Sequence, residues 1–207
     1  MLDLRAPGLP ADQGEPLDDD AYVSDFRARR KAIRNGESWK LERLQHFEEE
    51  NSPARDALRR GDWGEVLRLF EARRAVAHKA ADDDRRNGSP FHRLRVVEEP
   101  LTPYMQWELH SLHVRAEVGH PIRVLPAKEV VAAEADRLLP EIVILDNLTL
   151  YEILYTETGV FESARRFTDP EIVKPWVAYV KQGYAIAEDI RSYFERAVVH
   201  LPPPPAA

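Results

Sequence analysis

Residues 91–126 contain the order of elements that most constrains the fold of this chain. The run FHRLRVV at residues 91–97 is rich in apolar and β-branched side chains, which is typical of a strand. A helix is predicted from Pro103 to Gly119, and the run HPIRVLP at residues 120–126 predicts a second strand. An apolar stripe at helical spacing runs along the predicted helix: Met105, Leu109, Leu112 and Ala116. The order strand, helix, strand favours a parallel βαβ unit with a right-handed crossover.

The C-terminal part predicts more strands and a long helix. The runs EIVILD (141–146), TLYEILY (149–155) and VFESA (160–164) are separated by short turns, which is typical of an antiparallel meander. Pro170 follows a capping aspartate and begins a helix that we expect to run to about residue 199.

The first part of the chain reads as helical. Charged residues alternate with apolar ones at helical spacing, and capping residues precede several of the runs. The predicted helices cover residues 19–35, 39–50, 53–61 and 63–81, and residues 82–90 are the predicted linker. The expected fold class is therefore α+β (mixed α/β), with a helical N-terminal half followed by a roughly five-stranded mixed sheet packed with helices.

Composition changes along the chain predict its organisation. Residues 1–17 combine proline, glycine and acid with little apolar content and are expected to be a flexible tail. A helical region over 18–82 and an α/β domain over 90–199 follow, and residues 200–207 form a proline-rich tail.

Bulk composition excludes several classes of protein. No run approaches the ~18 apolar residues that span a bilayer, and the N-terminus lacks a secretory pattern. The absence of cysteine excludes thiol catalysis and fits a cytoplasmic protein. The net charge of −7 favours a protein or small-molecule partner, so we do not expect direct nucleic-acid binding. The arginine-rich helical half keeps nucleic-acid binding as a third hypothesis.

A set of residues between positions 96 and 146 carries a resemblance to a known family. These residues are Val96, Val97, Glu98, Pro100, Leu101, Tyr104, Glu108, Gly119, Ile122, Arg123, Leu145 and Asp146. With the upstream runs WKLERLQHF and LRRGDW, the chain resembles, over residues 20–197, an uncharacterised actinobacterial domain-of-unknown-function family. Members of that family often lie beside small helix-turn-helix regulators, so the resemblance implies a regulator protein as partner.

The second half is more weakly similar to phospholipase D-like domains. Active members of that group need a His-x-Lys motif, in which the histidine attacks phosphorus and the lysine binds the phosphate. No lysine of this chain has a histidine two positions before it. The resemblance therefore implies a sensing or scaffold role without that catalysis.

Candidate ligand-binding residues gather near the predicted strand ends. Glu98 and Asp146 each end a strand, and Arg123 lies on a neighbouring one, so the three could line a cleft or could form a structural ion pair. Tyr104 and Glu108 lie, with Arg115, on one border of the stripe of the predicted helix. The full candidate set is Arg95, Glu98, Tyr104, Glu108, Arg123 and Asp146.

Two functional hypotheses rank ahead of nucleic-acid binding. The first is a non-catalytic regulatory or sensor protein that binds a regulator protein or a small ligand at the strand ends. The second is an enzyme that uses Glu, Asp and Tyr for acid–base chemistry on a small or nucleotide-like substrate. We assign no catalytic residue and expect no cofactor and no metal. A metal site at His110, His113 and Glu117 is the alternative that we disfavour, because no second ligand cluster supports it.

Overall fold

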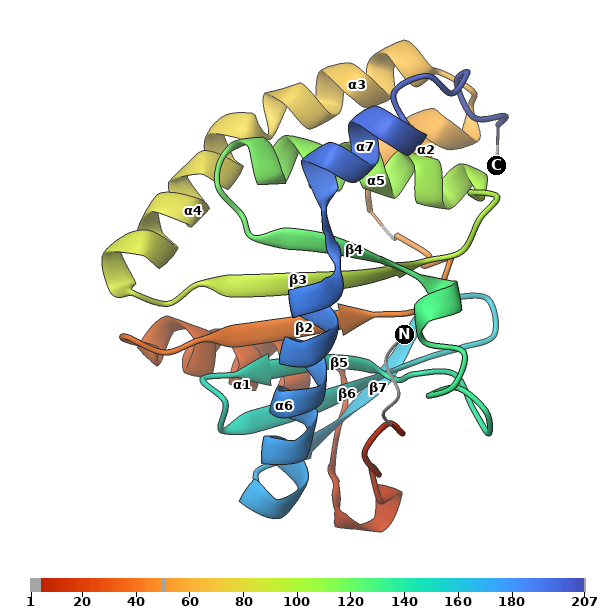
Figure 1. Cartoon of the computed structure of the whole chain (residues 1–207). Coiled ribbons are helices and arrows are strands. Elements are labelled where there is room, and N and C mark those ends of the chain that lie inside the picture. Colours follow the sequence, from red (N-terminus) through yellow and green to blue (C-terminus); the bar gives the residue numbers. More distant parts are fainter. Residues whose placement is uncertain (1–4, 50, 207) are drawn as a thin grey trace.

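The α+β fold class is confirmed by the computed structural model, which describes residues 5–49 and 51–206. Within those residues eight strands form one mixed sheet in the order β1-β7-β6-β5-β2-β3-β4-β8 (Figure 1). The strands are β1 (Glu15–Leu17), β2 (Ser38–Glu42), β3 (Phe91–Val97), β4 (Ile122–Pro126), β5 (Glu141–Leu145), β6 (Thr149–Tyr155), β7 (Phe161–Phe167) and β8 (Glu188–Asp189). The α-helices are α1 (Asp19–Ala32), α2 (Pro53–Arg59), α3 (Trp63–Ala72), α4 (Arg74–Asn87), α5 (Pro103–Glu117), α6 (Pro170–Ile186) and α7 (Ile190–Ala197), with short 3-10 turns η1 (Ala11–Gln13) and η2 (Ala127–Glu129).

The sheet has a parallel half and an antiparallel half that meet at β2. Strands β2, β3 and β4 are parallel neighbours, so the predicted βαβ unit β3-α5-β4 is present. Strands β5, β6 and β7 form the predicted antiparallel meander, and β5 pairs antiparallel with β2. The two short outer strands, β1 and β8, close the edges antiparallel to β7 and β4.

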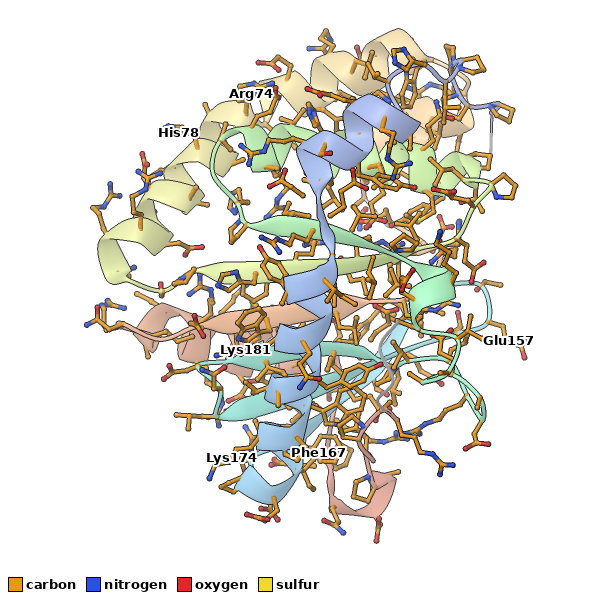
Figure 2. The ribbon with its side chains drawn as sticks, viewed as in Figure 1. Arg74, His78, Glu157, Phe167, Lys174 and Lys181 are labelled. Atoms are coloured by element: carbon orange, nitrogen blue, oxygen red, sulfur yellow. The ribbon has the colours of Figure 1, made fainter. Side chains whose placement is uncertain are left out.

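Helices cover the two faces of the sheet differently. Helix α6 lies across one face, as Figure 1 shows, and Trp176 packs there among side chains from β2 to β7, including Phe167 (labelled in Figure 2). On the opposite face, α2, α3, α5 and α7 build one apolar cluster against β3 and β4. Helix α1 builds a separate cluster against β5, β6 and β7. The face opposite α6 is therefore covered by two helical layers instead of one.

Local sequence signals explain where the helices begin. A side-chain oxygen accepts a hydrogen bond from the first turn at the start of most helices, which satisfies a backbone N–H that has no partner within the helix. These capping residues are Asp18, Ser52, Asp62, Thr102, Asp169 and Asp189. Proline at the first helical position of α2, α5 and α6 fits the same rule, because its missing N–H would be unpaired there.

The predicted helix over residues 39–50 is wrong. Residues 38–42 form β2 in the middle of the sheet, with Trp39 and Leu41 buried toward α6. Strand pairing on both sides of β2 outweighs the helix propensity of its lysine, leucine and glutamate. The first half of the chain is thus not purely helical, and it supplies the central strand.

Three further boundaries differ from the sequence-based expectation. The linker predicted over 82–90 is largely helix, because α4 continues to Asn87 and ends at Gly88, whose φ of 60° suits glycine. The predicted tail over 1–17 includes β1 and the buried Leu9, so it is ordered within its described residues. The predicted helix over 170–199 is interrupted after Ile186, where Glu188 and Asp189 pair with β4.

None of the helices in residues 5–49 and 51–206 is long and apolar enough to cross a membrane.

Candidate ligand-binding site

Charged side chains from β2 and β3 meet on the sheet face opposite α6. Because the strands are parallel with Lys40 opposite Arg93, and Glu42 opposite Arg95, four ionisable side chains project from one small area. The apolar residues between them, Leu41 and its neighbours on β3, point to α6 instead. The alternation of polar and apolar residues on these two strands is therefore what creates the charged area.

Glu42 lies between two cations. Its carboxylate contacts Arg93 Nη1 at 2.6 Å and Lys40 Nζ at 2.5 Å, and only 3% of its side chain is exposed. Burial acts to raise the pKa of Glu42, but the charges of Arg93 and Lys40 outweigh it and hold the pKa far below the usual range. Glu42 is therefore ionised at neutral pH and forms ion pairs with both Lys40 and Arg93.

Arg95 and Glu108 form a second, buried pair. Arg95 Nε donates to Glu108 Oε2 at 2.8 Å, and the exposed fractions of the two side chains are 0% and 8%. Arg95 Nη1 also donates to the backbone carbonyls of Glu42 and Val96, at 3.2 and 3.1 Å. Burial raises the pKa of Glu108, and the Arg95 guanidinium opposes that rise. The pair joins α5 to the centre of the sheet.

A cavity of about 360 Å³ opens beside these ion pairs. Its size falls in the range of small-molecule sites, which run from about 300 to 1,000 Å³. It lies where the α5 layer and the α1 layer adjoin, because Tyr155 packs against the apolar clusters of both. The charged side chains on its wall are four cations and four acids: Lys40, Arg73, Arg93, Arg115, Glu42, Glu48, Glu49 and Glu108.

The cations of the wall are not all neutralised. Arg115 on α5 and Arg73 at the end of α3 line the cavity, and neither guanidinium makes a hydrogen bond or ion pair with any residue that the structure describes. Burial and the nearby charges of Arg93 and Arg73 lower the pKa of Arg115 to about 10, so it remains charged at neutral pH. Arginine that faces a cavity without a carboxylate partner suits a carboxylate or phosphate ligand.

Aromatic side chains form the apolar part of the wall. Phe70 on α3 lies 5.5 Å from Trp107 on α5, measured between ring centroids. Trp107 is 5% exposed and its Nε1 donates to the carbonyl of Ala54 at 3.2 Å, which fixes the indole. The remaining aromatic residues of the wall are Phe47, Tyr155 and Phe161. Such a wall offers flat apolar contact to a ligand next to the charged groups.

Three of the predicted site residues lie together in this region. Arg95 and Glu108 form the buried pair, and Glu108 reaches the cavity wall. Tyr104 is 2% exposed, and its hydroxyl donates to Glu49 Oε1 at 3.2 Å. Burial raises the pKa of Tyr104 far above its usual value. Tyr104 thus supports the site from behind its wall.

The other three do not form the expected cleft with one another. Glu98 follows β3 and contacts Arg43 Nη1 at 2.6 Å, beside a separate hollow that also includes Lys128 and Arg196. Asp146 follows β5, which runs antiparallel to β2. It therefore lies beside the start of β2, at the opposite end of the strands from Glu98, and its backbone N–H donates to Ser38 Oγ at 3.4 Å. The cleft was expected because Glu98 and Asp146 both end strands, but the carboxyl ends of antiparallel strands do not lie together.

Arg123 lies on the other face of the sheet. Its Nη1 donates to the carbonyls of Tyr184 and Ala185, at 2.9 and 3.3 Å, and its guanidinium lies 4.8 Å from the ring centroid of Tyr184. These contacts hold the end of α6 against β4. They form neither the predicted cleft nor the ion pair with Glu98 or Asp146 that was the alternative.

The sequence-based set missed the residues at the centre of the site. Lys40 and Glu42 were assigned to a helix, and Arg93 was treated only as part of a strand. The signal that could have found them is the alternation Trp39-Lys40-Leu41-Glu42, which has the two-residue period of a strand.

The histidines of α5 are engaged in packing. The ring of His113 stacks on Phe194 with 4.1 Å between centroids, and the ring of His110 contacts Trp63 and Phe194 edge-on. Within residues 5–49 and 51–206, no group of three or more histidine, cysteine, aspartate or glutamate side chains could hold a metal ion.

Comparison with known families identifies the chain. The model of "Domain of unknown function (DUF6879)" matches residues 24–195. The chain belongs to this family. The match to the DUF6879 model includes both halves of the sheet and every strand except β1.

Among solved structures, the DUF6879 chain is similar to TrmBL2, which is described as an archaeal chromatin protein with a novel mode of DNA binding. The identity is 11% and the TM-score 0.41, and the match covers 88% of this chain and 55% of TrmBL2. The chain thus spans about half the length of that protein. A search of curated proteins found no match.

Proposed function

We propose that the DUF6879 chain is a non-catalytic sensor that binds a small ligand through a carboxylate or phosphate group, in the cavity beside α5. The observation that carries this proposal is the Arg115 guanidinium, which lines the cavity without a hydrogen bond or ion pair to any described residue. Arg93 and Arg73 lie near enough to influence its pKa, so three arginines surround one space. An anion there would accept charge-assisted hydrogen bonds from Arg115, whose guanidinium has no acceptor among the described residues.

The state of the acids favours recognition over catalysis. A general base needs a pKa near the working pH and freedom to accept a proton. Glu42 is bound by two cations that lower its pKa, and Glu108 is held by Arg95. The weak similarity to phospholipase D-like domains without a His-x-Lys motif supports the same conclusion.

One observation favours the alternative of an enzyme. Burial raises the pKa of Glu108, and this carboxyl lies on the cavity wall. Acid–base chemistry on a bound substrate would then pass through Glu108. Mass spectrometry of a ligand after incubation separates the two functions. A sensor returns the ligand unchanged, whereas an enzyme converts it in the wild type and not in Glu108→Gln.

The resemblance to proteins that lie beside helix-turn-helix regulators supports a regulator as the protein partner. We propose that ligand occupancy changes the association with such a regulator, which would place the protein in the cytoplasm. Gel filtration of the two proteins together, with and without ligand, tests this part; the same elution profile in both conditions would contradict it.

Thermal denaturation with a panel of carboxylates and phosphate monoesters tests the ligand site. A ligand present at about 100 times its Kd stabilises a native protein by about 2.7 kcal/mol, which raises Tm by roughly 5–10 °C in a chain of this size. We expect at least one anion to raise the Tm of the wild type and to lose this effect in Arg115→Gln. The matched control is Arg27→Gln, which removes the same charge from an exposed arginine of α1. Equal stabilisation of Arg115→Gln and the wild type would refute the proposed site.

A further inference from the structure

We propose that the ligand is an amphiphilic anion, whose apolar chain or ring lies in a groove between α4 and α5 while its carboxylate or phosphate is held by Arg115. This inference rests on the proposed function, and it adds the chemical class of the ligand. It is carried by a second hollow, of about 420 Å³, that shares Phe70, Arg73, Ser111 and Arg115 with the cavity wall.

Apolar side chains line this groove. Val76, Ala77 and Ala80 come from α4, and Val114 comes from α5. Val76 is 72% exposed, the largest fraction among the exposed large apolar residues of the described chain. Val76 and Ala80 are one helical turn apart and so lie on the same face of α4. An apolar molecule in the groove would remove this surface from water.

The rest of α4 has a different character. Its outward side carries charged or polar residues, including Arg74 and His78, which Figure 2 labels, and Lys79, which pairs with Asp83 at 2.9 Å. The small residues Ala77, Ala80 and Ser111 leave space between the two helices. The groove is thus an apolar channel in an otherwise charged surface.

The distribution of charge gives the orientation of the ligand. No carboxylate lines the groove, and its only charged residues are Arg73 and Arg115, among the residues that the structure describes. Both arginines also line the first cavity, so the positive charge lies at the junction of the two hollows. A molecule with one anionic end and one apolar end matches this arrangement, and a cationic amphiphile does not.

Calorimetric titration with two homologous series tests the inference. One series is the straight-chain carboxylates from acetate to octanoate, and the other is the corresponding alkyl phosphates, starting from inorganic phosphate. We expect the affinity to rise by about threefold to fourfold for each added methylene, until the groove is filled. The series that binds more tightly at equal chain length identifies the anionic group. An alkylamine series of the same lengths is expected not to bind.

Two matched variants test whether the apolar chain of the ligand lies in the groove. Ala80→Glu introduces a charge into the groove at an exposed position, and Ala75→Glu makes the same change at an exposed position of α4 outside the groove. We expect Ala80→Glu to abolish the dependence on chain length while the shortest anions still bind, and Ala75→Glu to behave as the wild type. Arg115→Gln should weaken all chain lengths by a similar factor.

The outcomes separate this inference from the proposed function. If short anions bind in an Arg115-dependent way but affinity does not change with chain length, the amphiphilic ligand is refuted and the sensor site stands. If no anion of either series binds, both proposals fail. A concentration-dependent dimer that Val76→Glu dissociates would show that a second copy of the chain fills the groove, which would also overturn the inference.

Discussion

Removal of one partner of the Arg95–Glu108 pair should strongly destabilise the protein. The Arg95 side chain is 0% exposed and the Glu108 side chain is 8% exposed, so water can compensate little of either charge when its partner is lost. Loss of one member of a buried pair typically lowers the free energy of unfolding by about 3–5 kcal/mol, because the remaining charge is uncompensated. For a chain of this length, that corresponds to a fall in Tm of roughly 6–20 °C. We expect this fall for Arg95→Met, which keeps most of the side-chain volume.

The double variant makes the prediction specific. In Arg95→Met with Glu108→Met, no unpaired charge remains, and an apolar pair fills the space between β3 and α5. The double variant should therefore lose less stability than the sum of the two single variants. We expect a coupling free energy of about 2–3 kcal/mol in a double-mutant cycle, toward the upper end of the range for residues in contact.

Urea denaturation measures the four free energies of unfolding in this cycle. The control is Arg85→Met, which breaks the Arg85–Asp82 contact; the Arg85 side chain there is 69% exposed, and an exposed pair of this kind contributes little. Additivity of the two single changes within about 0.5 kcal/mol would refute the reasoning, because it would mean that the two charges do not depend on each other.

Three further predictions concern other parts of the fold. Burial raises the pKa of Glu141 to about 7, so between the usual carboxyl range and pH 7 the native state binds more protons than the unfolded state, and the stability of the wild type falls as pH rises. In denaturation curves, the stability of Glu141→Gln relative to the wild type should therefore increase from pH 5 to pH 8. A constant difference would contradict this. The pKa of Asp25 is shifted in the opposite direction: burial acts to raise it, but hydrogen bonds from arginine and tyrosine side chains hold it at about 2. In thermal melts, the wild type should therefore be more stable than Asp25→Asn above about pH 4, and this difference should disappear as pH falls through 2. A Cβ atom on Gly36 would overlap the Asp146 carboxylate, so Gly36→Ala should lower Tm and the added change Asp146→Ala should restore part of it, whereas Gly8→Ala, which meets nothing within 4 Å, should leave Tm unchanged.

Local sequence patterns correctly predicted the elements whose partners lie nearby in the sequence. The unit β3-α5-β4 follows from two short apolar runs around a capped, proline-initiated helix. The meander β5-β6-β7 follows from short turns between strand-like runs. In both cases the partners are neighbours in sequence, so local signals contain most of the information.

Strand β2 could not be recognised in the same way. Its partners are β3, about fifty residues later, and β5, about a hundred residues later, and neither pairing leaves a local signal. The run WKLE also contains good helix formers, and only the tertiary contacts decide between the two structures. The candidate site inherited this error. Because Lys40 and Glu42 were placed on a helix, they did not enter the candidate set. The set relied instead on strand ends, and the ends that carry Glu98 and Asp146 lie apart.

The position of β2 also explains why the polar network and the cavity occur together. Its parallel neighbours send their crossover helices to one half of the face opposite α6, and the antiparallel neighbours are covered by α1 instead. Two separate helical layers do not close over the strands between them as one layer would, so side chains there remain near solvent or a ligand. Apolar residues at those positions would be exposed, whereas Lys40, Glu42 and Arg93 satisfy one another by ion pairs. Arg115 on α5 lies beside this network, but its guanidinium makes no ion pair with the described residues of the network. A ligand that provides the missing anion would therefore connect α5 to the charged side chains of β2 and β3, because all three elements line the cavity.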